Sequence, residues 1–190
     1  MNQSKTENKI MSLPPTAWDQ VSEGPWSKRR KHQSLIAGNK LLILGGFDGE
    51  GAFDLNDVWS YDGNSWELVT EHAGWSGRDG HSAVLFKSSI YVLGGTDDPY
   101  NCKNDVWRSD NGGYQWQQIT ACAPWPERWQ HAACVHNGHI YIIGGWGEWY
   151  LNDIWSSSDG MNWTCECAEA PWKPRMFLSV ISFKGAIYVM

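Results

Sequence analysis

The stretch Ile140–Trp155 reads IYIIGGWGEWYLNDIW: an apolar run, a double glycine, an aromatic loop and then Asn-Asp-Ile-Trp. Two earlier stretches have the same order, Leu42–Trp59 (LILGGFDGEGAFDLNDVW) and Ile90–Trp107 (IYVLGGTDDPYNCKNDVW). The first glycines of the three copies are 49 and 50 residues apart: Gly45, Gly94 and Gly144. A period near fifty residues indicates a chain built from structural repeats.

A second unit recurs four times, in which a Trp is followed eight or nine residues later by Pro-Trp or Gly-Trp and then by an Arg. The arginines of the four copies are Arg29, Arg78, Arg128 and Arg175. A short apolar run follows each Arg, and short turns such as Gly38-Asn39 and Asn137-Gly138 separate this run from the glycine stretch. Apolar runs of four to six residues joined by tight turns predict strands and hairpins.

Each repeat therefore predicts four strands in an antiparallel meander. Strand a follows the Arg, strand b ends at Gly-Gly, strand c carries Asn-Asp-Val/Ile-Trp, and strand d begins at the next Trp. A double glycine at a strand end indicates a sharp bend or the close approach of a neighbouring group. A single meander cannot bury both of its faces, and radial stacking of such units solves that problem. The expected fold class is an all-β propeller with four-stranded antiparallel blades.

These features resemble the kelch repeat of the galactose oxidase type. Five of them recur in register from residue 18 to residue 190: Gly-Gly, Asn-Asp, the Trp of strand c, the Trp of strand d, and the Pro/Gly-Trp-x-x-Arg corner. The resemblance implies a propeller of several blades, commonly closed by a strand from one terminus. The isolated strand d around Trp18 looks like half of such a closure.

The sequence predicts a polar, disordered tail at residues 1–16 and a partial propeller at residues 17–190. Its blades are expected at about 29–74, 78–124 and 128–171, with a partial blade at 175–190. The chain stops at Ile187-Tyr-Val-Met, where the next Gly-Gly is expected. We therefore expect an incomplete propeller of three full blades and parts of two. A closed four-bladed ring, with the Trp18 strand added to the last blade, is the alternative.

The loops that join strand b to strand c, and strand d to the next strand a, are expected on one face of the ring. Eleven of the 14 Trp residues occupy recurring positions, and the other three fall in the loops of the third blade: Trp129, Trp146 and Trp149. Together with Glu148 and Tyr150 they predict a platform for a peptide or a sugar ring. The alternative is that they only cap the third blade. Phe47 and Tyr100, in the other b–c loops, complete the candidate set.

The recurring arginines allow two interpretations. In kelch propellers of the adaptor type, arginines near this corner hold acidic peptide groups, so the resemblance implies a binding role for Arg78 and Arg128. The alternative is an ion pair within each blade, because Asp57, Asp105 and Asp153 recur just as regularly.

The histidines and cysteines predict neither a metal site nor a cofactor. His32, His81 and His131 occupy equivalent positions in different blades, with Leu178 at the fourth, so they are not expected to converge. The five cysteines include no CxxC pair and are expected to be reduced thiols.

Composition and motif content limit the classes of partner and activity that are expected. A net charge of -6 argues against nucleic acid as a partner. No signal peptide or membrane span is recognisable, so we expect a cytoplasmic protein that does not bind membranes. No catalytic motif is present. The expected function is a non-catalytic interaction module that binds a protein or peptide through its b–c and d–a loops. The alternative is a carbohydrate-binding or sugar-isomerising propeller, similar to the sialic acid mutarotases.

Overall fold

The computed structural model describes residues 23–51, 53–97 and 101–190, and within these ranges all regular structure is β-strand. The predicted tail at 1–16 and the strand around Trp18 lie outside the described residues. The first sheet consists of β1 (Arg29–Arg30), β2 (Gln33–Ala37), β3 (Lys40–Asp48), β4 (Phe53–Tyr61) and β5 (Trp66–Thr70). The second consists of β6 (Ser82–Phe86), β7 (Ser89–Thr96), β8 (Cys102–Ser109) and β9 (Gln117–Thr120). The third consists of β10 (Ala132–His136), β11 (His139–Trp146), β12 (Tyr150–Ser157) and β13 (Thr164–Cys167), and the fourth of β14 (Val180–Phe183) and β15 (Ala186–Val189).

The three larger sheets are antiparallel meanders in which strands a, b, c and d follow one another in sequence order. Two-residue turns join strand a to strand b in every sheet, as at Gly38-Asn39 and Asn137-Gly138. Both glycines have a positive φ, 62° and 74°, which the reversal of a tight hairpin requires. The predicted all-β blade architecture is confirmed.

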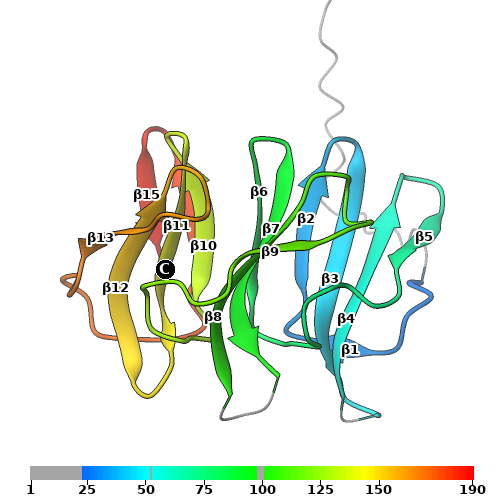
Figure 1. The fold of residues 1–190 in the computed structure, drawn as a ribbon, viewed down its shortest axis with the longest axis horizontal. Coiled ribbons are helices and arrows are strands. Elements are labelled where there is room, and N and C mark those ends of the chain that lie inside the picture. Colours follow the sequence, from blue (N-terminus) through cyan, green and yellow to red (C-terminus); the bar gives the residue numbers. More distant parts are fainter. Residues whose placement is uncertain (1–22, 52, 98–100) are drawn as a thin grey trace, which may run out of the picture.

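Figure 1 shows the first three sheets side by side, in the order of the sequence, with the fourth partly behind the third. Strand a of each sheet contacts strand a of the next: β2 with β6, β6 with β10, and β10 with β14. The four sheets do not close into a ring within the described residues, which fits an incomplete propeller. The first strands therefore line the inner side of an open arc.

The hydrophobic core lies between neighbouring sheets. In β7, Ile90 and Val92 pack in a cluster with residues of the first sheet, whereas Tyr91 and Leu93 pack in a cluster that includes residues of the third. All eight residues of β7 are buried, because the strand is covered on both faces. This burial explains why strand b is a continuous apolar run rather than an alternating one.

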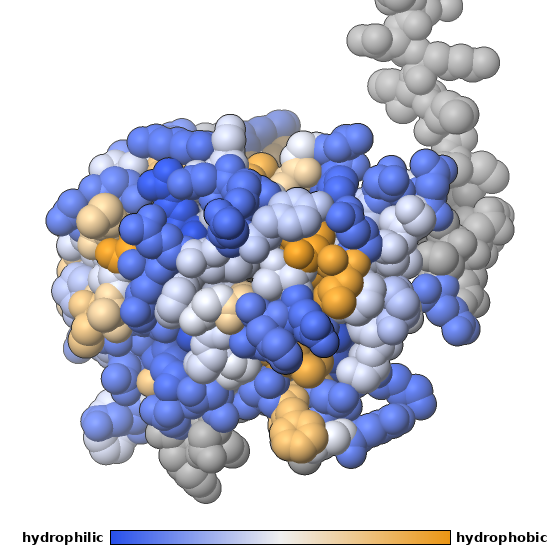
Figure 2. Space-filling view, turned by 45° about the vertical axis from the view of Figure 1, so that its right-hand side comes forward, coloured by the Kyte–Doolittle hydropathy of each residue, from blue (hydrophilic) through white to orange (hydrophobic). Residues whose placement is uncertain are grey.

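The surface turned forward in Figure 2 is largely hydrophilic, and its hydrophobic groups form small, separate patches. In the described part of the chain, no helix is long and apolar enough to span a membrane.

Candidate functional site

The b–c loops and the d–a connections lie together on one face of the sheets. Each d–a connection pairs with the end of strand b in the sheet that it enters: Arg30 with Phe47, Asp79 with Thr96, and Trp129 with Trp146. These three pairs occupy equivalent positions and differ completely in chemistry. The face therefore combines a repeated backbone with side chains that are specific to each blade.

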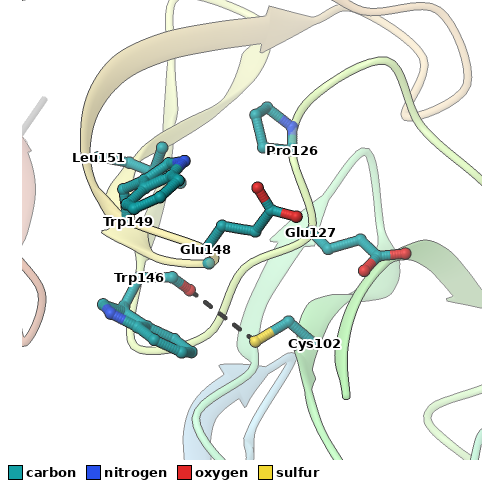
Figure 3. Close-up of a pocket in the computed structure, with 8 residues that line it drawn as sticks. Cys102, Pro126, Glu127, Trp146, Glu148, Trp149 and Leu151 are labelled. Atoms are coloured by element: carbon teal, nitrogen blue, oxygen red, sulfur yellow. Dashed lines mark hydrogen bonds between the residues drawn. The ribbon is translucent and has the colours of Figure 1, made fainter. Parts of the chain in front are cut away.

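A pocket of about 630 Å³ opens on this face between the second and third blades (Figure 3). Its volume lies within the range of small-molecule and side-chain binding sites. The second blade contributes the start of β8, the d–a connection contributes one wall, and the loop from β11 to β12 contributes the other. The lining residues are Cys102, Pro126, Glu127, Trp146, Gly147, Glu148, Trp149 and Leu151.

The aromatic wall of the pocket consists of one indole that packs against a neighbouring ring, Trp146, and one exposed indole, Trp149. Trp146 packs edge to face against Trp129, with ring centroids 6.3 Å apart and an interplanar angle of 85°. The two backbones are also hydrogen bonded, with N–O distances of 2.8 and 2.9 Å. Trp149, in contrast, is 73% exposed and Tyr150 is 53% exposed. The structure thus offers a fixed indole beside one that is available to a partner.

The polar groups of the pocket are two carboxylates and one thiol. Glu127 and Glu148 are exposed side chains that line the pocket, which contains no Lys or Arg among its lining residues. Burial, together with the nearby Glu127 carboxylate, raises the pKa of Cys102 to about 11. The Cys102 thiol donates a weak hydrogen bond to the Trp146 carbonyl at 4.0 Å. Because a thiol acts as a nucleophile only after losing its proton, Cys102 is not suited to covalent chemistry at neutral pH.

Next to the pocket, the face already holds a lysine from the first blade. The Nζ atom of Lys31 lies 4.1 Å from the centre of the Trp129 ring and 3.2 Å from Oδ2 of Asp79. Burial raises the pKa of Asp79, and the Lys31 charge opposes this shift. Lys31, Trp129 and Trp146 therefore form a connected row that leads from the first blade to the pocket.

The structure brings most of the predicted aromatic cluster together. Trp146, Glu148 and Trp149 line the pocket, and Trp129 packs behind Trp146. Tyr150 starts β12 next to Trp149 but does not line the pocket. Phe47 lies in the first blade, where the Arg30 guanidinium carbon lies 4.9 Å from the centre of its ring, and is not part of the pocket. Tyr100 lies outside the described residues.

Two of the candidate residues, Arg78 and Arg128, are not accessible to a partner. Their exposures are 1% and 0%, and both form two-pronged ion pairs, with Asp105 and Asp153 respectively. The alternative interpretation from the sequence, an ion pair within each blade, is the one that the structure contains. A buried guanidinium needs such a partner, which is why the Arg and the Asp recur together.

The histidines are part of the packing between blades. His81 and His131 are buried, and each ring lies near a Trp of the preceding d–a connection, Trp75 and Trp125. Burial, together with the Arg78 charge, lowers the pKa of His81 to about 3, and burial with the Arg128 charge lowers the pKa of His131 well below its usual value. No group of three or more His, Cys, Asp or Glu in the described ranges is arranged to hold a metal ion.

Sequence reasoning missed Cys102, Glu127 and Lys31 as neighbours of the site. Glu127 had a detectable signal, because the equivalent residues before the other recurring arginines are Lys28, Gly77 and Pro174. Cys102 and Lys31 carried no such signal, since they belong to other blades. Only the stacking of blades places them beside the third one.

Comparison with known proteins relates the chain to a family and to a curated relative. The profile of the KLHDC2/KLHL20/DRC7 Kelch-repeats domain matches residues 4–190. The Ras guanine nucleotide exchange factor F of Dictyostelium discoideum is 31% identical over 108 residues, which cover 54% of this chain. The matched segment is 10% of that protein's length.

Proposed function

The chain belongs to the kelch-repeat family, and from this premise we propose that it is a non-catalytic interaction module whose b–c and d–a loops bind a partner protein. In this proposal, a side chain of the partner enters the pocket between the second and third blades. The observation that carries the proposal is the pocket itself, because its lining includes Glu127, Trp146 and Trp149, at positions where the other blades carry different residues.

The chemistry of the pocket suits the anchor of a protein partner. Trp is enriched among the residues that dominate binding energies at protein interfaces. Trp149 presents such a ring at 73% exposure, while Trp146 is held from behind by Trp129. A partner side chain can therefore gain contact with a rigid surface, and only the exposed indole needs to be ordered on binding.

A carbohydrate ligand is the second candidate, because an exposed indole beside carboxylates also suits a sugar ring and its hydroxyl groups. Titration of the intrinsic Trp fluorescence with neutral and acidic sugars tests this candidate. Saturable quenching that disappears in Trp149→Ala would favour it. A Trp fluorescence signal that does not change with sugar concentration would exclude the carbohydrate ligand.

The protein-binding proposal can be tested with a random library of 12-residue peptides displayed on phage and selected on the 190-residue chain. The selected peptides are then measured against the wild type and Trp149→Ala. We expect the substitution to weaken binding at least tenfold, within the range of interface anchors. Since Trp149 is so exposed, its removal should leave the fold intact.

The matched control is Tyr114→Ala, which removes another exposed aromatic ring, in the connection between β8 and β9 on the opposite face. This variant should bind the selected peptides like the wild type. Binding within twofold of wild type by Trp149→Ala would contradict the proposal. So would an equal loss in both variants.

A further inference from the structure

We infer that the pocket between the second and third blades takes a cationic side chain, a lysine or arginine in a basic segment of the partner protein. This inference rests on the proposed function and names the chemistry of the partner. It follows from the charges of the pocket, its aromatic wall, and a lysine that the neighbouring site already holds.

The carboxylates of the pocket have no counter-charge within the described part of the chain. Neither Glu127 nor Glu148 forms a salt bridge with any of the described Lys and Arg residues. The basic residues next in sequence to the lining residues are already paired: Lys103 with Asp97 at 2.7 Å, and Arg128 with Asp153 at 2.6 Å. The pocket therefore has two negative groups and no positive one among its lining residues.

The aromatic wall adds to this attraction. In Figure 3, Trp146 and Trp149 lie on one side of the pocket, and the side chain of Glu148 extends from the same loop toward Pro126. The face of an indole ring attracts cations, and Trp is the strongest of the aromatic residues in this respect. A lysine or arginine stem can pack on the rings while its charged end approaches the Glu148 carboxylate.

Lys31 shows that this face holds a cation by the same combination of groups. Its Nζ lies 4.1 Å from the Trp129 ring centre and 3.2 Å from an oxygen of Asp79. That site combines one indole and one carboxylate, and its cation comes from within the chain. The adjacent pocket offers two indoles and the Glu148 carboxylate, with Glu127 at its edge and no internal cation among its lining residues. By analogy with the Lys31 site, we expect the partner to supply the cation that this pocket binds.

The charge of the whole chain favours the same partner. A net charge of -6 attracts basic segments at long range and accelerates their association at low salt. An acidic partner would be repelled by the chain and by the pocket. A neutral apolar side chain would leave the two carboxylates without a partner.

The test uses the peptides selected on the chain, together with variants in which each lysine or arginine is replaced by norleucine. We expect one basic position to recur among the selected peptides, and its replacement to weaken binding at least tenfold. Glu148→Gln and Glu127→Gln should each weaken binding of the basic peptides severalfold. Raising the salt concentration should weaken binding for the wild type more than for Glu148→Gln.

Glu169→Gln is the matched control, since it removes one exposed carboxylate outside the pocket. An equal loss in Glu148→Gln and Glu169→Gln would assign the effect to overall charge and overturn the inference. Peptides that depend on Trp149 but tolerate norleucine would also overturn it, while leaving the interaction function in place. If Trp149→Ala binds the peptides as the wild type does, or if no peptide is selected, both the proposed function and the inference are contradicted.

Discussion

At the residue scale, one arrangement of an Arg, an Asp and a Trp is repeated in three blades. In the third blade, Nη1 and Nη2 of Arg128 donate hydrogen bonds to the two carboxylate oxygens of Asp153 at 2.8 and 2.6 Å. Nη1 also donates to the carbonyl of Gly144, 16 residues later in the chain, at 2.9 Å. The Trp155 indole N–H donates to the same Asp153 carboxylate at 2.8 Å. The buried charges are thus paired and hydrogen bonded, as a buried ion pair requires.

Removal of one partner from this pair should be strongly destabilising. We expect Asp153→Ala to lower the free energy of unfolding by about 3–5 kcal/mol, because the buried Arg128 guanidinium is left without its counter-charge. Urea denaturation monitored by Trp fluorescence measures the change. The control is Glu50→Gln, in an exposed pair with Lys28 whose side chains are 72% and 90% exposed, which should leave stability unchanged. A loss below about 1 kcal/mol in Asp153→Ala would contradict the structural role.

The buried histidines predict a dependence of stability on pH. The folded-state pKa of His131 is depressed by burial and by Arg128. The unfolded chain therefore binds more protons than the folded chain below about pH 6.5, so stability falls as the pH falls through this region. His131→Leu should reduce the loss of stability between pH 6.5 and pH 5 by about 1.5 kcal/mol, measured by urea denaturation at the two values.

Leu is a suitable replacement, because Leu178 occupies the equivalent position just before the fourth sheet. Its side chain lies against Gly144 as the His131 ring lies against Gly94. His81→Leu removes the equivalent buried imidazole of the second blade, whose pKa is also lowered by burial, and should reduce the loss in the same way. Identical slopes in wild type and His131→Leu would show that His131 does not contribute to the dependence.

At the scale of the strand, the double glycine makes a bulge that connects one blade to the next. The register of β11 and β12 shifts between Ile143 and Gly145, and the Gly145 N–H then binds the Arg175 carbonyl at 3.0 Å. Gly145 has a φ of 103°, and an added Cβ would lie 2.7 Å from the Cβ of His131. A glycine is required both by the backbone conformation and by the space.

Two glycine substitutions separate these requirements. Gly138→Ala changes a hairpin glycine with a φ of 74° and no atom within 4 Å of an added Cβ. It should cost about 1–2 kcal/mol from the backbone conformation alone. Gly145→Ala adds the steric overlap and should cost about 2–5 kcal/mol in total. Urea denaturation of both variants measures the difference, and equal losses would show that crowding at Gly145 is unimportant.

At the scale of the whole molecule, the blades are joined by the same bonds at each junction. The second glycine N–H of one blade binds the recurring Arg carbonyl of the next, at 3.0, 2.9 and 3.0 Å: Gly46 to Arg78, Gly95 to Arg128, and Gly145 to Arg175. A second series joins the residues just before strand a of successive sheets, with backbone N–H groups donating from Gly80 to Lys31, from Gln130 to Gly80, and from Phe177 to Gln130. Each blade thus contacts its neighbours in sequence, and its stability depends on them.

Local stability should therefore differ between the sheets. The two-stranded sheet of β14 and β15 has mainly exposed or half-buried side chains, whereas β7 in the second sheet is buried throughout. We expect the amides of Val180–Val189 to exchange with solvent faster than those of β7. Hydrogen exchange followed by mass spectrometry of the intact chain measures both segments. Equal protection in the two would contradict this view.

Much of the candidate site could be read from differences between the repeats. Trp129, Trp146 and Trp149 stood out because the other blades lack a Trp there, and the structure places all three at or behind one pocket. The role of Arg78 and Arg128 could not be decided in this way. An Arg that recurs in every blade indicates the same role in every blade. Its sequence position does not show whether that role is a buried ion pair or an exposed binding group.

The sequence by itself determined the repeat, the strand order and the residues that must recur, because hydrophobic runs, turn glycines and paired charges act within one blade. Only the tertiary structure decided which blade-specific side chains meet. Cys102, Glu127 and Trp149 line one pocket because the second and third blades pack side by side. Lys31 reaches Trp129 across nearly two repeats because the residues just before strand a of successive sheets are hydrogen bonded to one another. Such contacts depend on the angle and spacing between sheets, which arise from packing and leave no periodic signal in the chain.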